Sequence, residues 1–388
     1  MSLSDANLSK LRSIRIYAFM TLVFFVIVEF LCFGIMELYY SINIDDGRNP
    51  MQYSDETIAK LYNSNEVEVY RRTISECWDS EIRKKRYEPL VEYVEDEYAG
   101  EFVNISDKGY RHNRHQYPLS RTKEKDTIRI FVFGGSTTFG YGVKDSETIP
   151  SYLQDYLEQR TGVKVAVYNF GAGYWYSTME RIRFSQLATD GYVADYAVFI
   201  DGLNDFSFYY LPDMTPKSRE IAHRHTASPW TQIVTSLNSM TLIEKVLRRF
   251  GVKKPNLTGK VATKGEIKRS VDRLDYNREL LKRAGELVGT TAIFVHQPSP
   301  YFRFDENTRA VPLTDSVKNQ ISSVAERIES AYELIEERKN QAYYQNLNMV
   351  WLQEFNIEGN MYVDYVHYSP AFNKAIADKI GENILSLL

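Results

Sequence analysis

The sequence predicts an α/β protein in which a parallel sheet of about five strands lies between two layers of helices. Short apolar runs with strand character alternate with helical patterns from about residue 126 onward, and this alternation is typical of a three-layer α/β/α fold. The chain of 388 residues is 44% hydrophobic and 25% charged, which suits a large folded core. Its formal net charge of −4 argues against a basic nucleic-acid-binding face, so we expect no nucleic-acid partner.

The first expected element is a membrane span of 21 residues, from Ile16 to Met36. A helix of this length covers roughly 30 Å, about the thickness of the apolar part of a bilayer. The run passes into Glu37 without a small-residue cleavage site, which favours an uncleaved signal anchor over a cleaved signal peptide.

The charges on either side of this span predict its orientation. Basic residues precede it and acidic residues follow it, so the positive-inside rule leaves residues 1–15 as a cytoplasmic tail. We therefore expect a single-pass protein of the inner or plasma membrane, with the remainder periplasmic or extracellular. The charges are Lys10, Arg12, Arg15, Glu37, Asp45 and Asp46.

Glu29 is the charged residue inside the predicted span. It is either a protonated or snorkelling carboxyl or a contact with another membrane protein, and both interpretations stay open. Cys32 and Cys77 are the two cysteines, too few for a disulfide framework or a cysteine metal site. His223 and His225 have no carboxylate or cysteine at ligand spacing, and we expect neither a metal nor another cofactor.

The exported part begins with residues 37–125, which are polar and rich in glutamate and tyrosine and are expected to form a stalk and peripheral helices. A main domain is expected over residues 126–388, with an insertion at 206–270. Its strands are predicted over residues 128–133, 163–168, 196–200, 291–295 and 349–352, and its helices over 150–160, 178–189, 317–345 and 370–387.

Chemistry is suggested by four short segments, three of which follow predicted strands. Ligands of open parallel sheets bind at the carboxyl ends of the strands, where such segments meet. The segments are Gly134–Ser136, Asn169–Ser177, Asp201–Asp205 and Asp364–His367.

Three residues of these segments suggest a nucleophile, its base and a carboxylate that orients the base. Ser136 follows a glycine turn and begins a helix. His367 can take the proton of Ser136, and Asp364, three residues earlier, can orient the imidazole. Each residue alone has a structural interpretation, as a helix cap, a loop residue or a surface histidine, but their joint occurrence favours catalysis.

The other segments supply hydrogen-bond donors for a developing oxyanion. We expect the side-chain amide of Asn204 to contribute, together with main-chain N–H groups of Ser136 and of Gly173 or Tyr174. Asn204 also has an alternative interpretation as an ordinary turn residue.

In this order, the segments resemble the SGNH (GDSL-like) hydrolase superfamily over roughly residues 126–388. The family carries its nucleophile in a block like Gly134–Ser136, its oxyanion asparagine in a block like Gly202–Asp205, and its aspartate and histidine in a block like Asp364–His367. The second block departs from the family pattern, since the usual glycine five residues after the asparagine is Tyr174 here, with Gly173 one residue earlier. The resemblance implies a flavodoxin-like sheet and ester cleavage through an acyl-enzyme.

The substrate is predicted less directly. Trp175, Phe206 and Tyr209 form either stacking walls for a sugar or packing contacts of the insertion, and both alternatives stay open. The favoured function is that of a membrane-anchored serine esterase that removes O-acyl groups, O-acetyl in particular, from an extracytoplasmic carbohydrate. The alternatives are an O-acyltransferase that acts on a polysaccharide or glycan, a lipid esterase, and a non-catalytic glycan-binding scaffold.

Overall fold

The computed structural model describes residues 5–40, 44–79, 82–207 and 262–388. The chain divides into two compact units. One unit contains α1 (Asp5–Tyr40), and the other contains all the remaining described elements. Tyr209 and most of the expected insertion lie outside the described residues.

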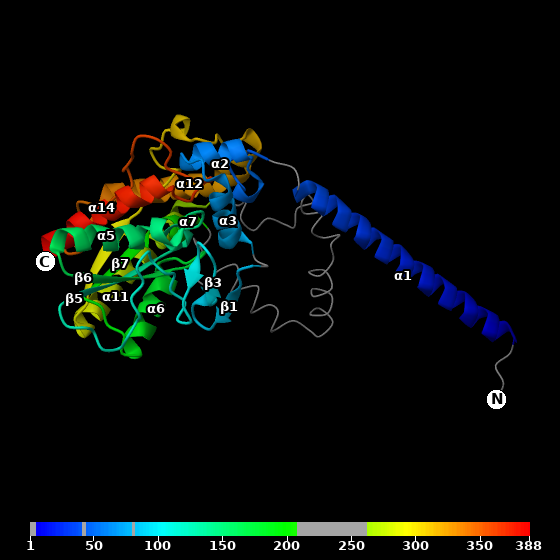
Figure 1. Cartoon of the computed structure of the whole chain (residues 1–388), viewed down its shortest axis with the longest axis horizontal. Helices are drawn as coiled ribbons and strands as arrows, with labels where there is room; N and C mark the ends of the chain where they lie inside the picture. The colour runs from blue at the N-terminus through cyan, green and yellow to red at the C-terminus, as the bar shows by residue number, and fades with distance from the viewer. Residues whose placement is uncertain (1–4, 41–43, 80–81, 208–261) are drawn as a thin grey trace. The chain divides into compact units, whose positions relative to one another are not determined.

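The second unit is built on a five-stranded parallel sheet with the order β6-β5-β7-β8-β9 (Figure 1). The strands coincide with the five predicted apolar runs, so the predicted fold class is confirmed. The chain moves from β5 to one side of the sheet and then returns to the other side, which leaves a switch point between β5 and β7. The strands are β5 (Thr127–Gly134), β6 (Lys164–Gly171), β7 (Tyr196–Asp201), β8 (Thr291–His296) and β9 (Met349–Trp351).

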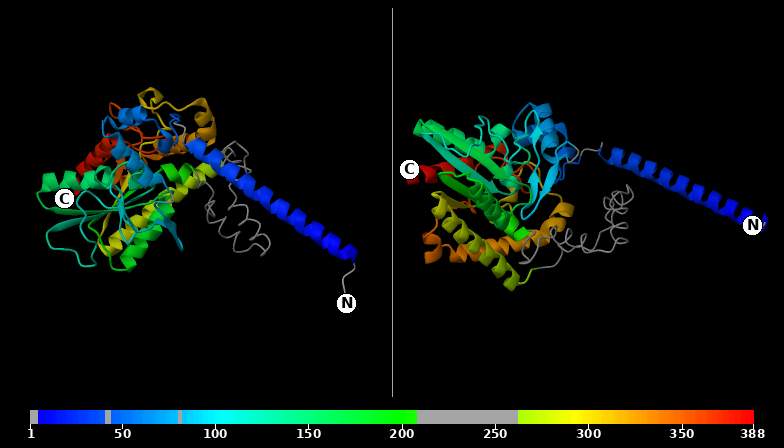
Figure 2. Two further views of the ribbon diagram at one scale, coloured as in Figure 1. Left: turned by 45° about the vertical axis from the view of Figure 1, so that its right-hand side comes forward. Right: turned by 90° about the horizontal axis from the view of Figure 1, so that it is seen from below.

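Alternate residues of each strand pack against different helices. Ile130 and Val132 lie in an aliphatic cluster with α5 (Ile149–Thr161) and α14 (Pro370–Leu387). Phe131 and Phe133 face the opposite side, in a largely aromatic cluster. That cluster includes residues of α6 (Ser177–Thr189) and α11 (Lys264–Val288), so helices cover both faces (Figures 1 and 2).

The helix predicted over residues 317–345 is two helices in the structure, α12 (Asp315–Arg338) and α13 (Ala342–Gln345). The two tyrosines of α13 bind to α11. Tyr344 Oη donates to Asp275 Oδ1 at 2.6 Å, and Tyr343 Oη donates to the carbonyl oxygen of the same residue.

Residues 44–125 pack within the same unit as the sheet. Their core residues include Tyr53, Ile58 and Ile74, which cluster with Val363 near the C-terminus. The division of the chain at residue 126 stays a prediction. The elements of this segment are η1 (Pro50–Gln52), α2 (Asp55–Tyr62), α3 (Val67–Trp78), β1 (Lys85–Glu88), β2 (Glu92–Glu95), β3 (Tyr98–Ala99) and β4 (Asn104–Ile105). The remaining short elements are α4 (Ser136–Phe139), η2 (Asp145–Glu147), α7 (Leu203–Ser207) and η3 (Glu306–Thr308).

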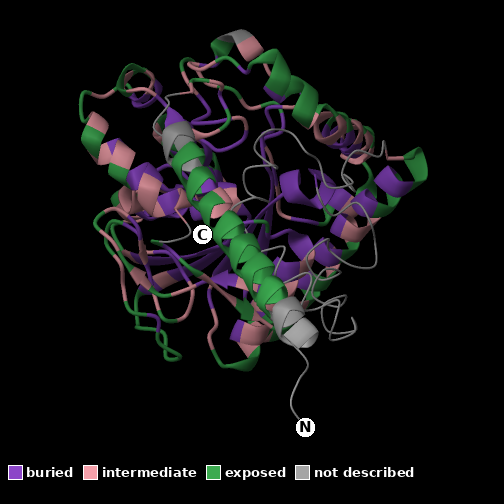
Figure 3. Cartoon of the chain, turned by 90° about the vertical axis from the view of Figure 1, so that its right-hand side faces the viewer, coloured by how far each residue is buried: buried purple, intermediate pink, exposed green. Residues whose placement is uncertain are grey.

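Helix α1 contains the predicted membrane span. Its stretch Arg12–Ile35 is long and apolar enough to cross a bilayer, by length and composition. Figure 3 colours most of the described residues of α1 as exposed, whereas most residues of the sheet strands are buried. A helix of this kind near an N-terminus is found in membrane anchors and in signal sequences.

Candidate active site

Ser136 is placed at the end of β5 by a turn that requires glycine. Gly134 ends the strand and Gly135 caps α4, whose first residue is Ser136. A Cβ atom at Gly134 would collide with the side chain of Thr138, and one at Gly135 would collide with the amide of Asn204. The turn therefore packs tightly against Asn204 of α7, the short helix after β7. Ser136 itself is half-buried.

Ser136, His367 and Asp364 form a continuous chain of hydrogen bonds. Ser136 Oγ lies 2.9 Å from His367 Nε2, and His367 Nδ1 lies 2.7 Å from Asp364 Oδ2. A carboxylate only accepts hydrogen bonds, so Nδ1 carries the proton and Nε2 is left to accept from the Ser136 hydroxyl. The structure thus brings Ser136 together with Asp364 and His367, which lie more than two hundred positions later in the sequence.

Asp364 is itself held by its own loop. Its Oδ1 accepts from the main-chain N–H groups of Val366 and His367, each at 2.7 Å. Both oxygens of this buried carboxylate are therefore engaged, one with the loop and one with the imidazole. This arrangement stabilises a negative charge next to the histidine.

Two aromatic rings confine the imidazole of His367. Tyr141, in the loop after α4, stacks on it at a centroid distance of 5.3 Å and an interplanar angle of 26°. Trp78, the last residue of α3, meets it edge-on at 5.6 Å. No sequence motif indicates either residue, although Trp78 is one of only four tryptophans in the chain.

The side-chain amide of Asn204 lies against Gly135, the residue before Ser136. Asn204 belongs to α7, directly after β7, and its Nδ2 donates to the carbonyl oxygen of Trp175 at 2.7 Å. The neighbouring Asp205 accepts from the Ser177 hydroxyl at 2.6 Å. The second and third sequence segments are therefore tied together next to the serine.

The second segment carries an unusual backbone. Tyr174 has a φ angle of 70°, in the left-handed region that glycine adopts most readily. The preceding amide, that of Gly173, donates to Glu95 Oε1 at 3.2 Å. Tyr174 thus has a backbone conformation that glycine adopts more readily, and the Gly173 amide is directed at Glu95.

Glu95 is the centre of a buried polar cluster that no sequence motif indicates. Its carboxylate forms ion pairs with Arg83 and with Lys85, the latter at 3.3 Å, and accepts from Tyr141 Oη at 3.5 Å. Glu95, Lys85 and Arg83 come from the β1–β2 ribbon and the loop before it, and Tyr141 comes from the loop after α4. The cluster connects the ribbon to the second segment and to the ring that stacks on His367.

The prediction that Trp175 and Phe206 stack on a substrate is wrong. Phe206 is 0% exposed and packs in the core with residues of α11 and α12, so it cannot contact a substrate. Trp175 is 3% exposed, packs among Val91, Val94 and Met179, and donates to the carbonyl oxygen of Tyr93 at 2.8 Å. Both side chains are packing residues, and among the described residues Trp175 packs against the β1–β2 ribbon and α6, not against the insertion, whereas Tyr174 of the second segment is 60% exposed.

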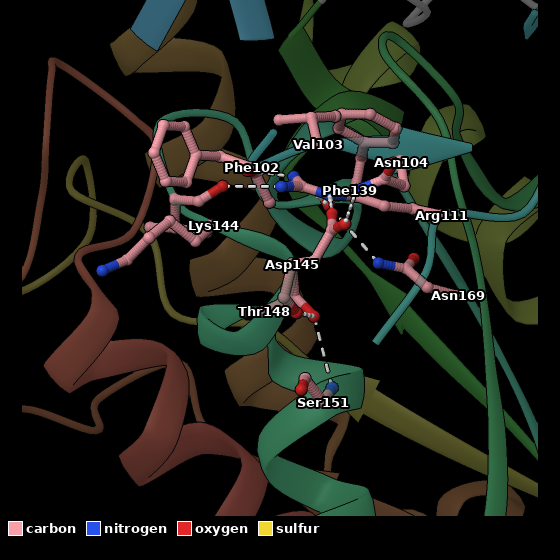
Figure 4. Close-up of polar contacts among 12 residues, drawn as sticks. Phe102, Val103, Asn104, Arg111, Phe139, Lys144, Asp145, Thr148, Ser151 and Asn169 are labelled. Carbon is pink, nitrogen blue, oxygen red and sulfur yellow. Dashed lines mark hydrogen bonds and ion pairs between the residues drawn. The ribbon is translucent and has the colours of Figure 1, made fainter. Parts of the chain in front are cut away.

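Arg111 supports the loop that follows Ser136 (Figure 4). This fully buried side chain donates to Asp145 Oδ1 at 2.8 Å and to the carbonyl oxygens of Phe139, Gly140 and Val143 at 3.0, 2.6 and 2.6 Å. Those residues flank Tyr141, so Arg111 fixes the loop that carries the ring stacked on His367.

Replacing Arg111 with methionine is expected to lower the free energy of unfolding by about 3–5 kcal/mol, because a buried carboxylate would lose its partner. Burial raises the pKa of Asp145, and Arg111 opposes that effect. Chemical denaturation measures the loss. The control is Arg114→Met, which removes an exposed partner of Asp155 and should cost less than about 1 kcal/mol; equal losses in the two variants would contradict the role of Arg111.

Comparison with known proteins identifies relatives of the sheet domain. The family model described as GDSL-like lipase/acylhydrolase matches residues 130–380. None of the curated proteins compared with the chain matches it.

Several solved structures are similar at low identity. A carbohydrate acetylesterase from Sinorhizobium meliloti has 12% identity and a TM-score of 0.40, over 67% of this chain and 100% of that one. A psychrotrophic esterase from Pseudoalteromonas sp. has 12% identity and a TM-score of 0.36, over 67% of this chain and 97% of that one. A GDSL-like lipase from Bacteroides thetaiotaomicron has 12% identity and a TM-score of 0.34, over 70% of this chain and 93% of that one.

Proposed function

Because the chain belongs to the family of GDSL-like lipases and acylhydrolases, we propose that it hydrolyses O-acyl esters through a covalent acyl-enzyme on Ser136. The observation that carries the proposal is the hydrogen-bonded chain from Ser136 through His367 to Asp364, at 2.9 and 2.7 Å. Its order and polarity are those needed for a serine nucleophile with a histidine base.

The reaction follows from this geometry. Ser136 Oγ attacks the ester carbonyl carbon while its proton passes to His367 Nε2, and Asp364 stabilises the imidazolium that forms. The tetrahedral intermediate expels the alcohol, which takes the proton from His367. Water then attacks the carbonyl carbon of the acyl-serine while His367 takes a proton from the water. The new tetrahedral intermediate releases the carboxylic acid, and Ser136 Oγ takes the proton back from His367.

The oxyanion would be held by the main-chain N–H groups of Ser136 and Tyr174 and by the amide of Asn204. Tyr174 is favoured over Gly173, because the Gly173 N–H already donates to Glu95. The left-handed conformation of Tyr174 also matches the position where the family has glycine. Each correctly placed donor typically lowers the barrier by roughly 3–4 kcal/mol.

We further propose that the active site lies outside the cytoplasm and acts on an O-acetylated carbohydrate. The apolar stretch of α1 with its basic N-terminal flank supports a signal anchor in the inner or plasma membrane. The exposed ring of Tyr174, next to the proposed oxyanion donors, supports a sugar substrate because it offers an aromatic face for stacking.

The test uses the full-length chain purified in detergent. We expect a fluorophosphonate probe to label Ser136, and we expect free acetate from 4-nitrophenyl acetate and from acetylated oligosaccharides. Transfer of acetyl to an added sugar acceptor would instead indicate an acyltransferase, and a preference for long-chain esters would indicate a lipid esterase. A folded protein that is neither labelled nor active would favour the non-catalytic scaffold.

A further inference from the structure

The Glu95 cluster carries one more positive than negative charge. Arg83 and Lys85 both bind the carboxylate of Glu95, one at each oxygen. One carboxylate neutralises one cation, so an excess positive charge remains. Arg83 and Glu95 are almost fully buried, whereas the side chain of Lys85 is 26% exposed, so solvent and ligands reach the cluster at Lys85.

Lys85 lies against the backbone that borders Ser136. A Cβ atom at Gly173 would overlap Lys85 Nζ, so the ammonium touches the residue that precedes the proposed donor Tyr174. The same nitrogen lies 5.3 Å from the centre of the Tyr174 ring. It also lies 5.6 Å from the ring of Tyr141, which stacks on His367.

The register of the β1–β2 ribbon holds this ammonium in place. Lys85 and Glu95 are directly opposite each other in the antiparallel pair, which favours their cross-strand contact. Burial by itself lowers the pKa of Lys85, but Tyr141 and Glu95 together raise it above its ordinary value. The side chain therefore carries its charge at neutral pH.

From this juxtaposition we propose that Lys85 binds an anionic group on the alcohol part of the ester, so that the protein selects acylated acidic sugars over acylated neutral ones. The inference rests on the proposed function and specifies its substrate class. The acetyl group proposed above has no charge, so a charged group must belong to the sugar. An ammonium has three donors; Glu95 Oε1 takes one and the Tyr141 hydroxyl takes a second, which leaves one donor for a carboxylate.

Tyr174 completes the subsite. Its ring is exposed and faces the same ammonium, so a sugar ring stacked on Tyr174 would bring its carboxylate within reach of Lys85. The subsite therefore combines an aromatic face with one cation, next to the backbone that would bind the oxyanion.

The experiment compares two substrates in the full-length protein: O-acetylated oligogalacturonate, which is acidic, and O-acetylated xylo-oligosaccharide, which is neutral. The readout is the ratio of their kcat/KM values for acetate release. We expect Lys85→Met to lower this ratio about tenfold, as for one charge-assisted hydrogen bond. Lys85→Arg should retain the preference, and the exposed neighbour Lys84 supplies the control, Lys84→Met, with an unchanged ratio.

A binding measurement separates this inference from the proposed function. Calorimetry with deacetylated oligogalacturonate requires no ester cleavage, and we expect about tenfold weaker binding to Lys85→Met than to the wild type. If neither ester is cleaved but this difference in binding is found, the proposed function fails and the subsite stands. A kcat/KM ratio and an affinity that are the same in the wild type and in Lys85→Met would overturn the subsite, as would an equal loss in Lys84→Met.

Discussion

Replacement of Ser136 by alanine is expected to lower kcat for acetyl ester hydrolysis by roughly 10⁴- to 10⁶-fold, because no other atom can form the acyl-enzyme. The change removes one hydroxyl whose hydrogen-bond partner is His367 Nε2. Since Ser136 is half-buried at a surface site, the free energy of unfolding should change by less than about 1 kcal/mol. Acetate release and chemical denaturation of the same preparation measure both quantities.

The control for this variant is Ser185→Ala, on the exposed face of α6, which should retain full activity. Labelling by a fluorophosphonate should disappear in Ser136→Ala and persist in Ser185→Ala. Substantial turnover by a folded Ser136→Ala protein would rule out Ser136 as the nucleophile.

Replacement of Asp364 by asparagine is expected to reduce kcat by roughly 10⁴-fold through the tautomer of His367. The asparagine oxygen can still accept from the N–H groups of Val366 and His367, so the loop should keep its shape. Its nitrogen, however, would donate to His367 Nδ1 and move the ring proton to Nε2. An Nε2–H group donates to Ser136 Oγ and cannot take its proton.

The matched control is Asp378→Asn, a half-buried carboxylate of α14 that pairs with Lys374 at 2.7 Å. This variant should lose less than about 1 kcal/mol of stability and no activity. Nuclear magnetic resonance of the imidazole nitrogens reports the tautomer directly. Undiminished kcat in Asp364→Asn, or an unchanged tautomer together with reduced kcat, would contradict this account.

The sheet could be predicted from the sequence because its strands are short, apolar and buried on both faces. Ile130 and Val132 point to one helix layer and Phe131 and Phe133 to the other, so the run is apolar throughout. The break after Arg338 was not predicted, and in the structure the residues that follow it bind Asp275 on another helix. Helix patterns record local periodicity and contain no information about such a distant partner.

The proposed reacting residues could be predicted because each lies in a short segment that follows an identifiable strand or precedes a helix. Ser136 Oγ and His367 Nε2 lie 2.9 Å apart because the topology of the sheet brings their segments to the same edge, and sequence periodicity indicates that topology. The surroundings were harder to predict. Phe206 and Trp175 are aromatic residues next to the site in sequence, yet side-chain direction places both in packing clusters.

Tyr174 and Gly173 show another limit of sequence patterns. Glycine is the usual residue for a left-handed backbone, so the glycine at 173 draws attention, but the positive φ belongs to Tyr174. The Gly173 amide donates to Glu95, which lies 78 positions earlier in the chain. Nothing in the local pattern of either residue indicates that bond.

The packing of residues 44–125 has a practical consequence for anyone who truncates the protein. A fragment limited to the residues of the family match would lack Trp78, Lys85 and Glu95. It would also expose Phe139 and Val363, which pack against residues 44–125 in the intact chain. Soluble expression should therefore start near Ile44, directly after the helix that we propose as the anchor. Gene fusions and domain exchanges have to move this longer piece as one block.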